Sequence, residues 1–244
     1  MPIAYTRHSP SKLNKFAAAP AMFVLEELMG MKQVVGVPAH RGTAVEAGVA
    51  YALLHPEHKT DNPAIKQAYS TYDGLTALSS DARREKYRAN IPDMVLTALA
   101  ELEGYGAPTA TQGAVTWHPE ELKYPIFGYY DFYWEEHGII IDLKTTERMP
   151  GEIKIPHARQ VAFYADGNYE GRLTYVTPKK VATYKLENVA QHRAALLSLA
   201  YKVEKFLTKG TEPEDFIEFT APDLEHYYWN TPEAREMAFK FWGV

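Results

Sequence analysis

The sequence predicts an α/β fold in which a block of strands lies between helical segments. The chain has 244 residues, of which 46% are hydrophobic, so it is long enough to bury a substantial core. Its N-terminal part and its C-terminal part consist mainly of helix-like segments. Between them, residues 113–178 contain β-branched and aromatic segments separated by turn residues. We expect one domain covering residues 1–244.

Helical signals dominate the N-terminal part. Ser9 resembles an N-cap and Pro10 a first-turn proline, and the helix that follows them is expected to be interrupted near Pro20 and ended by Gly30. A second helix is expected at residues 41–55. Both helices precede the first strand-like segment.

Two further regions are expected to be helical. Residues 56–112 are typical of a mainly helical insert, because helix-like segments alternate there with Pro and Gly. Residues 186–244 are expected to form a helical C-terminal extension that begins with a long helix at 187–210. The helix-like segments of the insert are 63–69, 80–90 and 92–104.

The strand-like segments follow one another in the middle of the chain. Between the third and the fourth, residues 156–167 are expected to form a helix that closes at Gly167. The expected strands are 113–118, 126–134, 138–146 and 172–178.

The composition excludes several classes of site. The sequence contains no cysteine, which rules out disulfides, thiolate zinc sites, cysteine-ligated iron–sulfur clusters and a cysteine nucleophile within this chain. No segment approaches the roughly 20 apolar residues of a membrane span, so we expect a cytoplasmic protein without a membrane partner. The formal net charge is −5, so a nucleic-acid partner would need a local basic face or a metal ion.

Two aspartates interrupt segments that otherwise have the pattern of buried strands. Residues 135–138, "EEHG", are a plausible hairpin loop, and pairing Trp134 with Ile139 places Asp131 directly opposite Asp142. Like charges opposed across a sheet are destabilising, so a compensating group is expected.

A hard divalent cation would compensate the two carboxylates. Mg²⁺ and Mn²⁺ bind carboxylates, backbone carbonyls and water, and the carbonyl of Leu143 lies next to Asp142 in the chain. Lys144 shares a strand face with Asp142, where it could position or deprotonate a water or stabilise charge on a phosphate. The pattern indicates metal-assisted phosphodiester hydrolysis. The alternative is a solvated hairpin face with Lys144 as an ordinary salt-bridge partner, and the D-x-K tripeptide alone favours that alternative.

Five sequence segments, in the expected order, favour the metal site over the solvated hairpin face. They are "SPSKLNKFAAAPAMFVLEELMG", "RGTAVEAG", "GYYDF", "IIDLKTT" and "HARQVAFYA", and they span roughly residues 9–180. Together they resemble the motifs of the PD-(D/E)XK nuclease superfamily, and within it the RecB-like and phage exonuclease branch. The resemblance implies a restriction-endonuclease-like core, with a central mixed β-sheet flanked by helices.

The resemblance also implies a site. Glu46, Asp131 and Asp142 would bind one or two Mg²⁺ ions, for which Mn²⁺ would substitute, and Lys144 would be the catalytic lysine. Glu46 stands where RecB-like members often have histidine, so it would supply a third carboxylate. On its own, such a residue is usually an exposed helix glutamate. Ala19 stands where iron–sulfur members have cysteine, so no cluster is expected.

Other residues near these motifs are candidates for contacts with DNA. Gln160 and Tyr164 are four residues apart on one helix face, where an amide and a ring could contact a nucleotide, although Tyr164 could equally serve packing. Phosphate contacts are expected from Arg159, Thr145 and Arg41, which otherwise would be solvated. His40 and His157 are expected to support the site or to make structural hydrogen bonds.

These features together predict a Mg²⁺-dependent DNA exonuclease of the phage type, acting in recombination, replication or repair in a bacterial cell or a phage-infected host. An endonuclease of the same fold and a catalytically silent DNA-binding or assembly module remain alternatives. A single-strand annealing or recombinase partner is expected, and the sequence leaves open whether the protein is a monomer or a ring. The absence of "GxxxxGK[ST]" assigns any ATP-driven unwinding to another chain.

Overall fold

The computed structural model describes residues 4–58, 63–166 and 168–244, and the chain divides into two compact units. The sheet unit consists of residues 35–114 and 129–190. The helical unit consists of residues 1–34, 115–128 and 191–244. Whether the two units act as one domain, as we expect from the sequence, stays a prediction.

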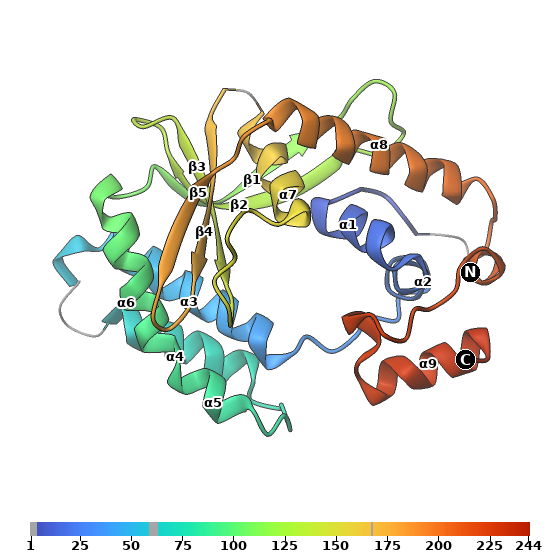
Figure 1. The fold of residues 1–244 in the computed structure, drawn as a ribbon, viewed down its shortest axis with the longest axis horizontal. Coiled ribbons are helices and arrows are strands. Elements are labelled where there is room, and N and C mark those ends of the chain that lie inside the picture. Colours follow the sequence, from blue (N-terminus) through green and yellow to red (C-terminus); the bar gives the residue numbers. More distant parts are fainter. Residues whose placement is uncertain (1–3, 59–62, 167) are drawn as a thin grey trace. The chain divides into compact units, whose positions relative to one another are not determined.

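The sheet unit contains a sheet that has five strands in the described part of the chain, in the order β1-β2-β3-β4-β5 (Figure 1). The β2–β3 and β4–β5 pairs are antiparallel and the β3–β4 pair is parallel, which confirms the predicted mixed sheet. The sequence analysis missed β5, because five residues that include Ala182 and Lys185 give a weak strand signal. The strands are β1 (Ala110–Trp117), β2 (Ile126–Trp134), β3 (Ile139–Thr145), β4 (Glu170–Val176) and β5 (Val181–Lys185).

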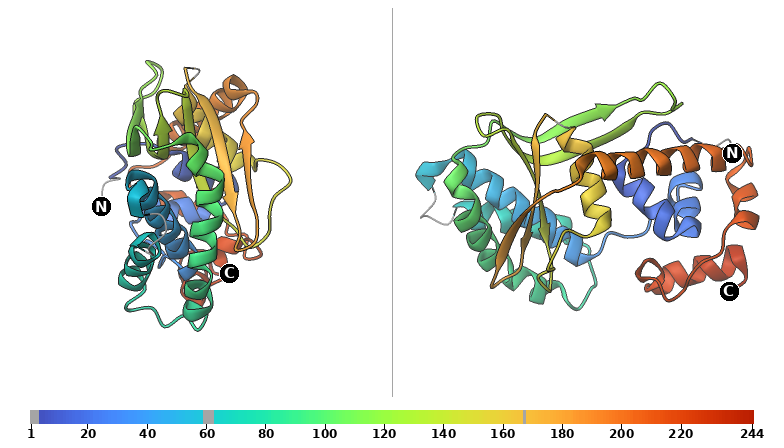
Figure 2. Two further views of the ribbon diagram at one scale, coloured as in Figure 1. Left: turned by 90° about the vertical axis from the view of Figure 1, so that its left-hand side faces the viewer. Right: turned by 45° about the horizontal axis from the view of Figure 1, so that its top comes forward.

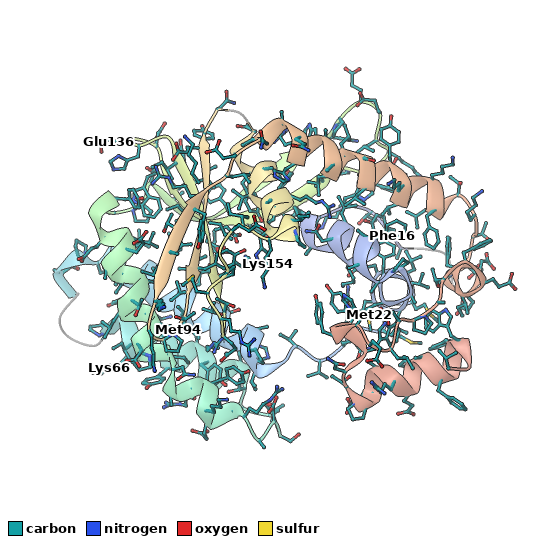
Figure 3. The ribbon with its side chains drawn as sticks, in the orientation of Figure 1. Phe16, Met22, Lys66, Met94, Glu136 and Lys154 are labelled. Carbon is teal, nitrogen blue, oxygen red and sulfur yellow. The ribbon has the colours of Figure 1, made fainter. Side chains whose placement is uncertain are left out.

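Helices cover both faces of this sheet, as the views in Figures 1 and 2 show. On one face, alternate β3 residues (Ile139, Ile141 and Leu143) belong to a buried cluster with α3, α4 and α6; Met94 of α6, labelled in Figure 3, is part of it. On the other face, α7 packs on β3 and β4. The helices are α3 (Val37–Leu54), α4 (Pro63–Leu75), α5 (Arg84–Ala89), α6 (Ile91–Leu102) and α7 (Ile155–Ala165), with short helices η2 (Pro56–His58) and η3 (Glu103–Tyr105).

Helix α7 connects the parallel strands β3 and β4. It closes at Asp166, whose φ of 40° is left-handed, whereas the end predicted at Gly167 lies outside the described residues. A Cβ on Gly171 of β4 would lie 2.7 Å from Val161 of α7, so the helix packs closely on the strand only because this position is glycine. This close packing fixes α7 over the strand face that carries Asp142 and Lys144.

The helical unit begins with the predicted N-cap. The Ser9 hydroxyl accepts a hydrogen bond from the Lys12 backbone N–H (3.2 Å), and the helix is interrupted at Ala19, next to Pro20, as predicted. Beyond it, Gly30 has a left-handed φ of 72°. The helices of this unit are α1 (Pro10–Ala18), α2 (Pro20–Phe23), η1 (Val24–Leu28), α8 (Val189–Leu207), η4 (Pro213–Phe219), η5 (Tyr227–Trp229) and α9 (Pro232–Trp242).

The C-terminal tail contributes to the core of the helical unit. Trp229 and Ala238 are fully buried in a cluster with Ala21, Met22 and Leu25 of the N-terminal helices. Figure 3 labels Met22 in this cluster. Among the described residues, no helix combines the length and the apolar character needed to cross a membrane.

Candidate active site

The hairpin of β2 and β3 has the register that the sequence predicts. Trp134 pairs with Ile139 and Phe132 with Ile141, around a four-residue turn that contains Glu136, labelled in Figure 3. The turn closes at Gly138, whose φ of 61° favours glycine. The regular pairs therefore lead directly to the two aspartates.

Asp131 lies at the point where this regular pairing ends. Continuing the register would pair Tyr130 with Leu143, but the Leu143 N–H donates instead to Oδ2 of Asp131 (2.7 Å). The Asp131 side chain therefore replaces a strand partner, and it is only 8% exposed. This bond anchors the Asp131 side chain at the residue that follows Asp142 in β3.

Asp142 and Lys144 form an ion pair on β3, in which the carboxylate is buried and the Lys144 side chain is 28% exposed. Asp142 has no exposed surface, and its Oδ2 lies 2.5 Å from the Lys144 ammonium. Among the described residues, no hydrogen-bond donor meets its other oxygen, Oδ1. A buried carboxylate oxygen without a donor is unusual, and it leaves capacity for a cation at this position.

Glu46 reaches the same site from α3, which packs on β3. The side-chain amide nitrogen of Gln112, on β1, donates to Oε1 of Glu46 and to Oδ1 of Asp131 (3.2 Å). One amide group thus bridges two of the three acids that the sequence predicts as metal ligands.

Burial and crowding shift the pKa values of these groups upward. Burial raises the pKa of Glu46 to about 7; the charge of Lys144 opposes this shift and Asp142 adds to it. Burial, together with the neighbouring Asp142, raises the pKa of Asp131 well above its ordinary value. Although burial opposes a charge on Lys144, the carboxylates of Asp142 and Asp131 raise its pKa. Three acids thus share one lysine, and burial favours the protonated form of two of them.

The α7 residues predicted to contact DNA also lie at this site. Gln160 donates from its amide nitrogen to the Tyr164 hydroxyl (3.0 Å), and Tyr164 is 3% exposed. Burial raises the pKa of Tyr164, and the Asp142 carboxylate adds to this shift. The ring of Tyr130, on β2, lies 6.5 Å from that of Tyr164. The structure therefore brings Gln160 and Tyr164 of α7 beside the acids and Lys144.

Comparison with known families identifies the chain. A family model described as the PD-(D/E)XK nuclease superfamily matches residues 7–239, nearly the whole sequence. This protein belongs to that superfamily. It is therefore a nuclease, a phosphodiester hydrolase of a superfamily that uses divalent metal ions, and the resemblance inferred from the sequence motifs is confirmed.

A solved structure supports the same fold for this nuclease. A Eubacterium rectale protein that carries the provisional name of exonuclease superposes with a TM-score of 0.56 at 14% identity, covering 82% of this chain and 80% of that one. A protein described as SSO0001 gives a TM-score of 0.35 at 17% identity, covering 68% and 85% of the two chains, which is too low to argue from. No curated protein matches the sequence.

The donor set of the site fits a divalent cation. Carboxylates are the ligands that Mg²⁺ and Mn²⁺ prefer, and the unpaired Oδ1 of Asp142 supplies a buried acceptor. Among the described residues, however, no three acidic or histidine side chains already form a coordination group. Gln112 bridges Glu46 and Asp131, and Lys144 holds Asp142, so an ion that bound all three acids would require their side chains to rearrange.

The predicted phosphate contacts have different surroundings. Arg41 is 2% exposed, pairs with Glu147 (2.5 Å) and lies over the Tyr87 ring, so contact with a phosphate would require that ion pair to open. Thr145 is half-buried at the end of β3, and its hydroxyl packs closely on Gly42. A Cβ on Gly42 would lie 3.3 Å from this hydroxyl. Arg159 is also half-buried, and burial lowers its pKa. Their roles stay predictions.

The two histidines differ. His157 forms a hydrogen bond between its Nδ1 and the Tyr175 hydroxyl (2.7 Å), so it has the structural bond that the sequence suggested as one outcome. Burial, with the charges of Lys144 and Lys154, lowers the pKa of His157 to about 4, which makes it neutral at pH 7. His40 is half-buried on α3.

Sequence reasoning missed Gln112, Glu147 and Tyr175. Gln112 is separated from Asp131 by a whole loop and half a strand, and no motif marks it. Its only sequence signal is the glycine that follows it, because glycine inside a strand often marks a bulge or a close approach. Glu147 and Tyr175 become visible only as partners of Arg41 and His157.

Proposed function

We propose that this nuclease is a Mg²⁺-dependent exodeoxyribonuclease of the RecB-like, phage exonuclease type, in which Glu46, Asp131 and Asp142 hold the metal and Lys144 is the catalytic lysine. The observation that carries the proposal is the ion pair between the buried Asp142 and Lys144, beside two further acids of raised pKa. Perturbed acids around one lysine are typical of a functional site. DNA is the substrate that membership of the superfamily implies.

The bound ion would polarise the scissile phosphate and lower the pKa of the attacking water. Glu46, Asp131, Asp142 and the backbone carbonyl of Leu143 are the groups that would hold it. Lys144 would act beside them as a fixed positive charge that stabilises the negative charge developing on the phosphate. Because the pKa of Lys144 is raised, this role suits it better than that of a general base at neutral pH.

The α7 residues would orient the strand that is cut. Gln160 presents an amide beside the site that would donate to a nucleotide, and the buried Tyr164, which accepts from this amide, would stack on a base only after its ring became exposed. Thr145, Arg159 and Arg41 would meet phosphates further along the strand. A role in recombination, replication or repair, with a single-strand annealing or recombinase partner, follows from the phage exonuclease resemblance.

Digestion of end-labelled linear DNA and covalently closed circles, single- and double-stranded, tests this function. The wild type should degrade linear DNA with Mg²⁺ and not with EDTA, and it should leave the circles intact. Lys144→Ala should reduce the rate by about 100- to 1,000-fold, as expected for the loss of a transition-state stabiliser. Lys66→Ala, an exposed lysine on α4 labelled in Figure 3, should leave the rate unchanged.

Two other results would replace the proposal. Cutting of closed circles would assign an endonuclease of the same fold. Equal inactivity of wild type and Lys144→Ala with both Mg²⁺ and Mn²⁺, while both still bind DNA, would assign a silent DNA-binding or assembly module.

A further inference from the structure

We propose that Gln112 is a positioning residue of the metal site: its amide holds Glu46 and Asp131 next to each other before a cation binds. The proposal rests on the proposed function, because it concerns the same acids. It adds a residue from β1 that belongs to none of the motifs described above.

The first observation is the double contact. The Gln112 amide nitrogen donates to Oε1 of Glu46 and to Oδ1 of Asp131 (3.2 Å). An amide nitrogen has two N–H groups, which is the number needed to join two carboxylates. Without this bridge, two acids that belong to different elements would repel each other in a partly buried site.

The second observation is the backbone of Gln112 itself. Its φ is 53°, in the left-handed region that residues other than glycine rarely adopt. Such a conformation persists only where its surroundings stabilise it, and it often marks a functional position. Here the unusual φ belongs to the residue whose side chain reaches the two acids.

The third observation is the packing of the Tyr130 side chain, from β2, over the residue that follows Gln112. A Cβ on Gly113 would lie 2.0 Å from the Tyr130 hydroxyl oxygen, so only glycine permits this packing. Tyr130 directly precedes Asp131 in the chain. The Tyr130 ring therefore packs on β1 directly beside Gln112, and Tyr130 is the chain neighbour of an acid of the site.

A bridge of this kind is compatible with a bound ion. Each carboxylate oxygen has two lone pairs, so it can accept from Gln112 with one and bind a cation with the other. Groups that hydrogen-bond to metal ligands orient them, and their loss typically costs about 10- to 100-fold in metal affinity. Gln112 would act in this way on two ligands at once.

The test measures Mn²⁺ affinity by calorimetry in the absence of DNA, with no readout of activity. Gln112→Ala and Gln112→Gly should both weaken Mn²⁺ binding by about 10- to 100-fold. Gln112→Asn, which keeps the amide on a shorter side chain, should bind as weakly as Gln112→Ala because it cannot span both acids. Thr116→Ala, an exposed change on the same strand, should bind as the wild type does.

Thermal unfolding with EDTA separates positioning from simple stabilisation. Glycine adopts a positive φ without strain, so Gln112→Gly should unfold at a higher temperature than Gln112→Ala although both have lost the amide. A purely structural role would make Mn²⁺ affinity follow stability, and the two variants would then differ in affinity. Equal loss of affinity with unequal stability supports the proposal.

Other outcomes overturn it separately from the proposed function. If the Gln112 variants bind Mn²⁺ as well as or better than the wild type, while Glu46→Gln loses binding, the acids are the metal site and the amide does not position them. If Glu46→Gln also binds Mn²⁺ as the wild type does, the proposed metal site is wrong.

Discussion

Buried acids occur in both units, but their surroundings differ. In the helical unit, Glu27 forms ion pairs with Lys15 (2.9 Å), Lys32 (2.8 Å) and Lys12 (3.2 Å). Although burial opposes its ionisation, its bonds to Lys32 and Lys15 lower the pKa of Glu27 to about 2. Three lysines therefore offset the negative charge of Glu27.

Glu204 of the same unit is equally well paired. It accepts the backbone N–H groups of Lys123 (3.1 Å) and Tyr124 (2.9 Å), and its Oε1 lies 3.1 Å from Nε2 of His8. Burial lowers the pKa of His8, so a neutral His8 donates to Glu204 and accepts from the Tyr5 hydroxyl (2.9 Å). The pKa of Glu204 is lowered by these bonds, against the effect of burial.

In the sheet unit the balance is reversed. Glu46, Asp131 and Asp142 share Lys144 and the amide of Gln112, and the pKa values of Glu46 and Asp131 rise. Acids that stabilise a fold are matched by donors and cations where they lie. Buried acids without enough neighbouring positive charge cost stability. A bound cation would supply the missing positive charge.

The largest expected difference between the two groups of acids is in activity. Asp142→Asn should reduce Mg²⁺-dependent DNA hydrolysis by about 100-fold or more, because the variant loses a metal ligand and the partner of Lys144. Glu27→Gln should leave the rate per folded molecule unchanged. Initial rates on labelled linear DNA, with circular dichroism to confirm folding, measure both; similar losses in the two variants would contradict the distinction.

The next largest difference is in stability, because substitution of the two acids should change the free energy of unfolding in opposite directions. At pH 8 with EDTA, Glu46→Gln should raise the free energy of unfolding by about 1–3 kcal/mol, because it removes a charge that burial disfavours. Glu27→Gln should lower it by about 1–3 kcal/mol, because it removes the carboxylate that pairs with Lys12, Lys15 and Lys32. Urea unfolding followed by fluorescence measures both values. A loss of stability in Glu46→Gln would show that this glutamate is a structural acid.

The smallest expected effect is a pH dependence. The folded-state pKa of Glu46, about 7, lies above its ordinary value, so its stabilising contribution is present at low pH and is lost as pH rises through 7. Metal-free protein should lose about 1 kcal/mol between pH 6 and pH 8 from this group. Glu27 has the opposite sign, since its contribution is present above its ordinary pKa and is lost only as pH falls through about 2.

Urea unfolding of the wild type and of Glu46→Gln across this range isolates the Glu46 contribution. The slope should be flatter in the variant and should disappear in the wild type when Mg²⁺ is saturating, because the ion then competes with the proton. An identical slope in both proteins would assign the pH dependence to other groups.

The sequence alone determined the fold class and the β2–β3 register. A four-residue loop that ends in a glycine is a local feature, and local chemistry is sufficient to set the register of a hairpin. The same feature brings Asp131, Asp142 and Lys144 together, because a register brings distant residues into contact. The order of the motifs was sufficient to identify the superfamily.

Only the tertiary structure decided how these charges are satisfied. It turned Asp131 onto the Leu143 N–H, paired the buried Arg41 with the exposed Glu147 and brought Gln112 between two acids. Each of these contacts joins residues that no common periodicity or short motif relates. The partners of a charge depend on the packing of whole elements, so the sequence indicates which residues are charged and the fold determines what neutralises them.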